Sequence, residues 1–182
     1  NAGRRAATGE FVAWMDADDL MVPGRICAQV AVLESHPEIG LVSSDFSAFV
    51  DPGADFAASH IASYYHALAR LGGVEAVYPT HLAHVESGLG QVQVRSGSAY
   101  DSLVWGNFVH PPTVMVRRSA LDAAGLADES LRYSSDYDQI LRIARLTHFA
   151  FVDAALLRYR LSSGQMSNAG GSEQMQMETV QI

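Results

Sequence analysis

A short apolar run that ends in a cluster of acidic residues is the feature that most constrains this chain. Residues 11–15, Phe-Val-Ala-Trp-Met, directly precede Asp16, Asp18 and Asp19. A run of this length with aromatic and β-branched members is typical of a strand buried on both faces of an α/β fold. In an open α/β sheet, ligands bind beyond the carboxyl ends of the strands. The carboxylates are therefore expected at a ligand-binding edge of the sheet.

The acidic cluster suggests a metal site. Carboxylates packed against a strand repel one another and lose solvation, and a bound divalent cation relieves both effects. Hard cations such as Mg²⁺ and Mn²⁺ prefer carboxylate oxygen. The alternative is a polar turn that leaves the strand, in which Asp19 bonds backbone N–H groups of the next turn. The flanking residues decide between the two readings.

Composition excludes several classes of protein. The chain has 182 residues, of which 48% are hydrophobic and 18% charged, so it can bury the core of one globular domain. The formal charge of -8 argues against a nucleic-acid partner, because phosphate backbones require clustered basic residues. All 12 basic residues are arginine, which excludes a lysine nucleophile. No apolar run approaches the ~18 residues of a membrane span, so none is expected in this segment.

Three segments carry the motifs that point to a family. In chain order they are Asn1-x-Gly3, Gly9-Glu10 and Pro23-Gly24-Arg25 around the acidic cluster; Thr113-Val114-Met115-Val116-Arg117-Arg118 with Ser135-Asp136-Tyr137-Asp138; and Tyr159-Arg160-Leu161-Ser162. Together they resemble, in the same order, the sequence of a family 2, GT-A-type inverting glycosyltransferase. The resemblance covers most of residues 1–168.

This resemblance implies an α/β fold, the GT-A fold of nucleotide-diphospho-sugar transferases, with a mixed, mainly parallel sheet and helices on both sides. Family members begin with strands that have no counterpart before Asn1. The chain is thus expected to be the C-terminal two-thirds of the catalytic domain, inactive in isolation. Residues 1–168 would form the partial domain, with a variable excursion at 72–99, and residues 169–182 a loose tail or short helix.

The donor-side roles come from the same resemblance. Asp16 would contact the ribose or sugar side of the donor, and Asp18 would bind Mn²⁺ or Mg²⁺. Arg160 could pair with the diphosphate, although an arginine in a strand more often forms a surface ion pair. Relatives often have a histidine where Ser162 stands, and serine is a poor metal ligand.

The acceptor-side roles fall on Asp136 and His110. The resemblance implies that Asp136 is the base that takes the proton of the acceptor hydroxyl. In the first turn of a helix, free N–H groups would keep its pKa low; the alternative is that it only favours the helix dipole. The family pattern is Glu-Asp, and Ser135 replaces the glutamate. His110 could bond a substrate hydroxyl, or be a loop residue whose hydrogen bonds are satisfied within the protein.

The expected function is hexosyl transfer from a nucleotide-sugar to a glycan or lipid-linked acceptor, in cell-surface polysaccharide synthesis. The expected location is the cytoplasm, including the inner face of the membrane, and self-association is left open. Two alternatives remain: a GT-A-like nucleotidyltransferase, and a non-catalytic or degenerate fragment that acts as an interaction module.

Local patterns predict several elements. Ile26, Val30 and Leu33 would form the inward face of a helix after Pro23. Residues 59–71 read as one amphipathic helix, and residues 91–94 alternate like an edge strand. His81 and His84 lack a third ligand nearby, so no zinc site is expected there.

Overall fold

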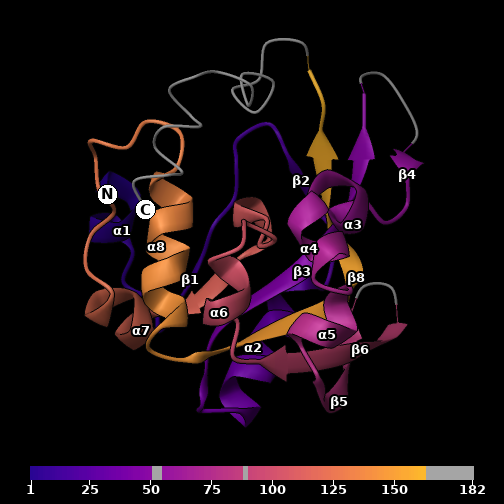
Figure 1. Cartoon of the computed structure of the whole chain (residues 1–182), viewed down its shortest axis with the longest axis horizontal. Helices are drawn as coiled ribbons and strands as arrows, with labels where there is room; N and C mark the ends of the chain where they lie inside the picture. The colour runs from indigo at the N-terminus through magenta and orange to yellow at the C-terminus, as the bar shows by residue number, and fades with distance from the viewer. Residues whose placement is uncertain (51–54, 88–89, 163–182) are drawn as a thin grey trace.

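The computed structural model describes residues 1–50, 55–87 and 90–162 (Figure 1). Its elements in chain order are α1 (Ala2–Ala6), β1 (Phe11–Ala13), β2 (Leu20–Met21), α2 (Arg25–Ser35), β3 (Ile39–Phe49), β4 (Asp55–Ala57), α3 (Ile61–Tyr64), α4 (His66–Arg70), α5 (Val74–Val77), β5 (Thr80–Ser87), β6 (Gly90–Gly97), α6 (Tyr100–Leu103), the 3-10 turn η1 (Pro111–Thr113), β7 (Met115–Arg117), α7 (Arg118–Ala123), α8 (Ser135–Ala144) and β8 (His148–Arg160). The predicted tail at 169–182 lies outside the described residues.

The strands form one mixed sheet in the order β1-β7-β3-β8-β6-β5, with β2 paired to β8 and β4 paired to β3. Its centre is the parallel pair of β3 and β8. Every residue of β3 is buried. The two long central strands form the buried centre of the sheet, and β7 and β6 pair with them on either side.

Helices cover both faces of the sheet, as predicted. On one face, α2 packs its Ala28, Val32 and Leu33 against residues such as Ile39 and Val42 of β3. On the other face, α6, α7 and α8 pack over the sheet (Figure 1). The core on that face includes Leu103, Leu121, Ile140, Phe149 and Phe151.

The prediction of a mainly parallel sheet is wrong for the described strands. Only β3 and β8 pair in parallel, and the other pairings are antiparallel. Parallel strands are typically buried on both faces, and β3 is buried along its whole length and β8 along most of it. Burial of β1 on both faces is also wrong, since this strand lies at an edge of the described sheet and Ala13 is exposed.

The expected inward face of α2 is correct at Leu33 but wrong at Ile26. Ile26 is exposed, whereas Arg25 and Gln29 are buried together with Ala28, Val32 and Leu33. The prediction considered only hydrophobic residues, whereas the buried face of α2 includes two polar side chains, Arg25 and Gln29. Their hydrogen bonds, described below, explain why they are buried.

Residues 59–71 form two short helices instead of one. The break is at Tyr65, whose φ of -104° and ψ of 91° are extended. Tyr65 then begins the second helix, because the N–H of Leu68 donates to its carbonyl oxygen at 3.0 Å. This bend lets the Tyr65 side chain reach His110, a tertiary contact that no local pattern encodes.

Residues 72–99 contain the β5–β6 hairpin. β6 pairs with β8 on one side and β5 on the other, so residues 91–94 are not in an edge strand; β5 is. His81 and His84 lie on β5 with ring centroids 5.6 Å apart. Within the described part of the chain, no helix has the length and apolar character needed to cross a membrane.

Candidate active site

The acidic loop lies at the carboxyl edge of the central parallel strands. Asp16, Asp18 and Asp19 are in the turn between β1 and β2, and β2 pairs with the last part of β8 through Leu20 and Arg158. The side chains of Asp16 and Asp18 are exposed, while Asp19 is 5% exposed. The predicted placement at a strand end is confirmed.

Asp19 anchors this loop to β8. Its Oδ1 accepts a hydrogen bond from the backbone N–H of Arg160 at 3.0 Å, and the Arg160 Nε donates to the carbonyl oxygen of Asp18 at 2.7 Å. Burial raises the pKa of Asp19 to about 6, against the opposing effect of the Arg160 N–H. Asp19 is therefore structural, as expected, but its partner is on β8 instead of the next turn.

Arg25 anchors the segment that leads from β1 into the acidic loop. Its Nη2 donates to the carbonyl oxygens of Trp14 at 3.0 Å and Val114 at 3.3 Å, and its Nε donates to Gln29 Oε1 at 3.0 Å. The Gln29 Nε2 donates in turn to Thr113 O at 2.7 Å. Arg25 is fully buried, which lowers its pKa to about 10. The buried pair thus joins the acidic loop to the segment that follows His110.

Asp136 lies in the first turn of α8. Its Oδ1 accepts a hydrogen bond from the N–H of Tyr137 at 2.7 Å. The pKa of Asp136 is nevertheless raised, first by burial and further by the negative charge of Asp16. The expected low pKa is therefore wrong, because desolvation outweighs the stabilisation by helix N–H groups. The effect of Asp16 on this pKa means that the acidic loop and the start of α8 lie within electrostatic reach of each other.

Tyr65 and His110 form a contacting pair within electrostatic reach of these two carboxylates. The Tyr65 hydroxyl and His110 Nδ1 are 3.0 Å apart. Burial raises the pKa of Tyr65, and the charges of Asp136 and Asp16 add to that shift. The His110 ring stacks on Phe46 with centroids 3.9 Å apart.

His110 is a neutral group in this position. It is 3% exposed, and burial lowers its pKa to about 3. Its Nε2 is buried and has no hydrogen-bond partner among the described residues. Its role toward a substrate hydroxyl stays a prediction, and that nitrogen is the atom which could carry it.

The comparison with known families identifies the chain. The family model for Glycosyl transferase family 2 matches residues 1–98. That match spans more than half of the 182 residues. The chain belongs to glycosyl transferase family 2. A search of curated proteins found no match.

The family match covers only part of the candidate site of this family 2 glycosyltransferase. It contains the acidic loop, α2 and Tyr65, whereas His110 and Asp136 follow it. Family membership therefore supports glycosyl transfer and nucleotide-sugar and acceptor substrates in general. Because His110 and Asp136 lie outside the matched range, the proposals for their roles rest on the geometry described above.

The acidic loop fits a hard divalent cation. After burial, the charge of Asp18 is the second cause of the raised pKa of Asp16, so the two carboxylates repel each other. The described residues contain no group of three or more histidine, cysteine, aspartate or glutamate side chains placed to hold a metal. Mg²⁺ is commonly bound through one or two carboxylates together with substrate phosphates. The exposed carboxylate of Asp18, with Asp16 beside it, is compatible with that mode, in which the substrate completes the metal coordination; the separate roles of Asp18 as metal ligand and Asp16 as donor contact stay predictions.

Arg160 has a different environment from the one predicted. Besides its bond to Asp18, its guanidinium lies over the Phe49 ring, 4.8 Å from the centroid. These contacts make Arg160 a residue that positions the acidic loop. Contact with a diphosphate stays a prediction.

Sequence reasoning missed Arg25, Gln29 and Tyr65 as residues of the site. Arg25 and Gln29 are four positions apart, a spacing that places both on one helix face, directly after the acidic cluster. This spacing could have indicated that the two side chains act together next to the acidic loop. No comparable signal marked Tyr65, because its role follows from a bend between two helices.

Proposed function

We propose that the enzyme transfers a sugar from a nucleotide-diphospho-sugar to an acceptor hydroxyl, with inversion at the anomeric carbon. The observation that carries this proposal is that the charge of Asp16 in the acidic loop contributes to the raised pKa of Asp136 in α8, so the two carboxylates lie within electrostatic reach of each other. One carboxylate belongs to a loop suited to a metal and a diphosphate, and the other to a helix that could serve the acceptor. Their proximity supports a single site in which donor and acceptor meet.

On the donor side, Asp18 would bind Mn²⁺ or Mg²⁺, which supplies Lewis-acid neutralisation of the diphosphate, and Asp16 would contact the ribose or sugar side of the donor. Arg25 and Arg160 donate to the carbonyl oxygens of Trp14 and Asp18, and the Asp19 side chain accepts the N–H of Arg160, so the backbone that carries the exposed carboxylates is fixed. Such fixed geometry reduces the reorganisation that the reaction requires.

On the acceptor side, Asp136 would take the proton of the attacking hydroxyl. The acceptor oxygen forms a bond to the anomeric carbon as the bond from that carbon to the diphosphate oxygen breaks. A raised pKa makes Asp136 a stronger base when it is ionised, and a base is most effective with a pKa near the working pH. A single displacement of this kind inverts the configuration.

The proposed role is synthesis of a cell-surface polysaccharide, by analogy with the family. The substrates would be a nucleotide-sugar and a glycan or lipid-linked acceptor.

Metal dependence tests the donor side. In the full-length enzyme, Asp18→Asn should abolish release of nucleoside diphosphate from a panel of nucleotide-sugars with Mn²⁺ or Mg²⁺, because it removes the proposed metal ligand. The fold should survive, since the Asp18 side chain is exposed. Asp153→Asn, an exposed aspartate on β8, is the matched control and should keep full activity. Unchanged metal-dependent turnover in Asp18→Asn would contradict the assignment.

A further inference from the structure

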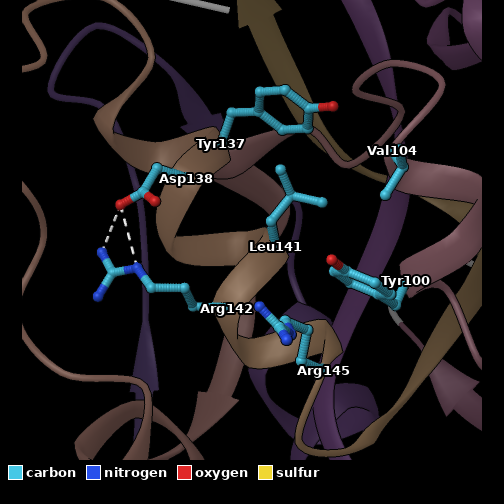
Figure 2. Close-up of a pocket in the computed structure, with 7 residues that line it drawn as sticks. All are labelled: Tyr100, Val104, Tyr137, Asp138, Leu141, Arg142 and Arg145. Carbon is cyan, nitrogen blue, oxygen red and sulfur yellow. Dashed lines mark hydrogen bonds and ion pairs between the residues drawn. The ribbon is translucent and has the colours of Figure 1, made fainter. Parts of the chain in front are cut away.

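The first turn of α8 carries two carboxylates, and one of them is already engaged in an ion pair. Asp138 accepts a hydrogen bond from the Nε of Arg142 at 3.1 Å, and both side chains line the pocket between α6 and α8 that Figure 2 shows. Tyr137 lines the same pocket, and its hydroxyl donates to the carbonyl oxygen of Leu103. Asp136 does not line this pocket. The substrate of Asp136 is therefore to be sought on another side of the helix.

Tyr65 is a hydroxyl donor within electrostatic reach of Asp136. Burial is the first cause of the raised pKa of Tyr65, and the charge of Asp136 adds to it, so this hydroxyl keeps its proton at neutral pH. Among the described residues, no hydrogen bond joins the two side chains: the Tyr65 hydroxyl contacts His110 Nδ1, and Asp136 Oδ1 accepts the N–H of Tyr137. Each side chain thus keeps hydrogen-bonding capacity that these contacts do not use.

His110 fixes the direction of the Tyr65 hydroxyl. The His110 ring is held by stacking on Phe46, with centroids 3.9 Å apart, and by an edge contact with Tyr159 at 4.8 Å. Its Nε2 is buried and has no partner in the described part of the chain. A buried N–H without an acceptor is rarer than a buried acceptor without a donor, so we assign the proton to Nδ1. His110 then donates to the Tyr65 oxygen, and the Tyr65 proton is directed to another acceptor.

Tyr65 is also more accessible to a substrate than His110. Tyr65 is partly exposed, whereas His110 is 3% exposed and its Nε2 is buried. A substrate that contacts Nε2 has to displace the rings packed around it, while one that contacts the Tyr65 hydroxyl leaves the stack on Phe46 in place. In this arrangement His110 acts through Tyr65, as a positioning residue.

We propose that Tyr65, oriented by His110, donates a hydrogen bond to the acceptor hydroxyl whose proton Asp136 takes. The inference rests on the proposed function and adds a substrate-binding residue to it. A hydroxyl group has one hydrogen and two lone pairs. With one lone pair bonded to Tyr65 and the hydrogen bonded to Asp136, the second lone pair is left to attack the anomeric carbon. The new carbon–oxygen bond forms as the bond to the diphosphate oxygen breaks, and the proton passes to Asp136.

The test is steady-state transfer by the full-length enzyme, with a panel of UDP- and GDP-sugars as donors and methyl glycosides as acceptors, below the melting temperature of every variant. Tyr65→Phe should lower kcat/KM for the acceptor by about tenfold, the loss expected for one hydrogen bond to an uncharged partner. Its affinity for the donor, measured by calorimetry with Mg²⁺, should equal that of the wild type, because the donor is assigned to the acidic loop. Tyr64→Phe, the matched neighbour, should transfer as the wild type does.

A double variant tests the positioning step. Because His110 acts through Tyr65, His110→Phe should lower acceptor transfer alone but add little to Tyr65→Phe, and additive losses would overturn that step. Unaltered acceptor kinetics in Tyr65→Phe, or an equal loss of donor affinity, would overturn the inference. Nucleoside diphosphate release by the wild type is measured separately. Its absence contradicts the proposed function, whereas its presence with an unaltered Tyr65→Phe contradicts only the contact of Tyr65 with the acceptor.

Discussion

The two halves of the site are stabilised in different ways. The acidic loop is held mainly through its backbone: Arg25 bonds Trp14 O, Arg160 bonds Asp18 O, and the N–H of Trp14 donates to Val114 O at 2.8 Å. The acceptor side is held by side chains, through the Tyr65–His110 contact and the stacking of His110 on Phe46.

This difference predicts different consequences of mutation. Because the loop is fixed through backbone atoms, Asp16 and Asp18 remain exposed for a ligand while Arg25 and Arg160 provide the stability. On the acceptor side, single side chains determine both packing and the electrostatics of Asp136. Changes to the loop anchors should therefore act first on stability, and changes around Asp136 on turnover.

The largest effect on turnover is expected at Asp136. Asp136→Asn should reduce kcat by at least about 10²-fold, the lower end of what a positioned base contributes. A role confined to the helix dipole predicts instead a loss of up to about 1 kcal/mol in stability with transfer nearly intact. Turnover and melting temperature measured on the same variant separate the two. Near-normal turnover in a folded protein would contradict the catalytic role.

The second effect concerns the backbone anchor of the loop. Arg25→Met should lower the free energy of unfolding by about 2–3 kcal/mol, the range of a hydrogen bond to a charged group, because it leaves Trp14 O without that donor. Urea unfolding measures the loss. Arg70→Met, at an exposed position on α4, is the control and should stay within about 0.5 kcal/mol. Equal stability of the two variants would show that Arg25 is not an anchor.

A smaller effect is expected at Tyr65. Tyr65→Phe removes the hydroxyl next to His110 Nδ1 and should cost about 1 kcal/mol of unfolding free energy. Tyr64→Phe is the matched neighbour and should cost less, since its ring contacts with Phe46 and Tyr159 persist. The same urea experiment compares them, and a larger loss in Tyr64→Phe would reverse the assignment.

The sequence predicted the architecture better than the details of the site. The family resemblance implied helices on both faces of a mixed sheet, and the run ending at Asp16 located the acidic loop at the end of a strand. The direction of the shorter strands could not be predicted, because antiparallel pairing of β1 with β7 joins segments that are distant in the chain. Tertiary contacts decided those pairings.

The site residues that were missed share a physical cause. Arg25 and Gln29 are buried because carbonyl groups of other segments need donors, which hydrophobic periodicity does not report. The raised pKa of Asp136 likewise depends on burial and on Asp16, more than a hundred positions earlier. Helix position alone therefore predicted the wrong direction of the shift.

The most direct test of a single shared site is the pKa of Asp136 itself. A ¹³C NMR titration of its carboxyl group, without metal, should give a pKa above the ordinary 3.8. Removal of the neighbouring charge in Asp16→Asn should lower that pKa, because Asp16 disfavours ionisation of Asp136. Asp122→Asn, an exposed control on α7, should leave it unchanged. An Asp136 pKa that does not respond to Asp16→Asn would contradict the claim that the acidic loop and α8 form one site.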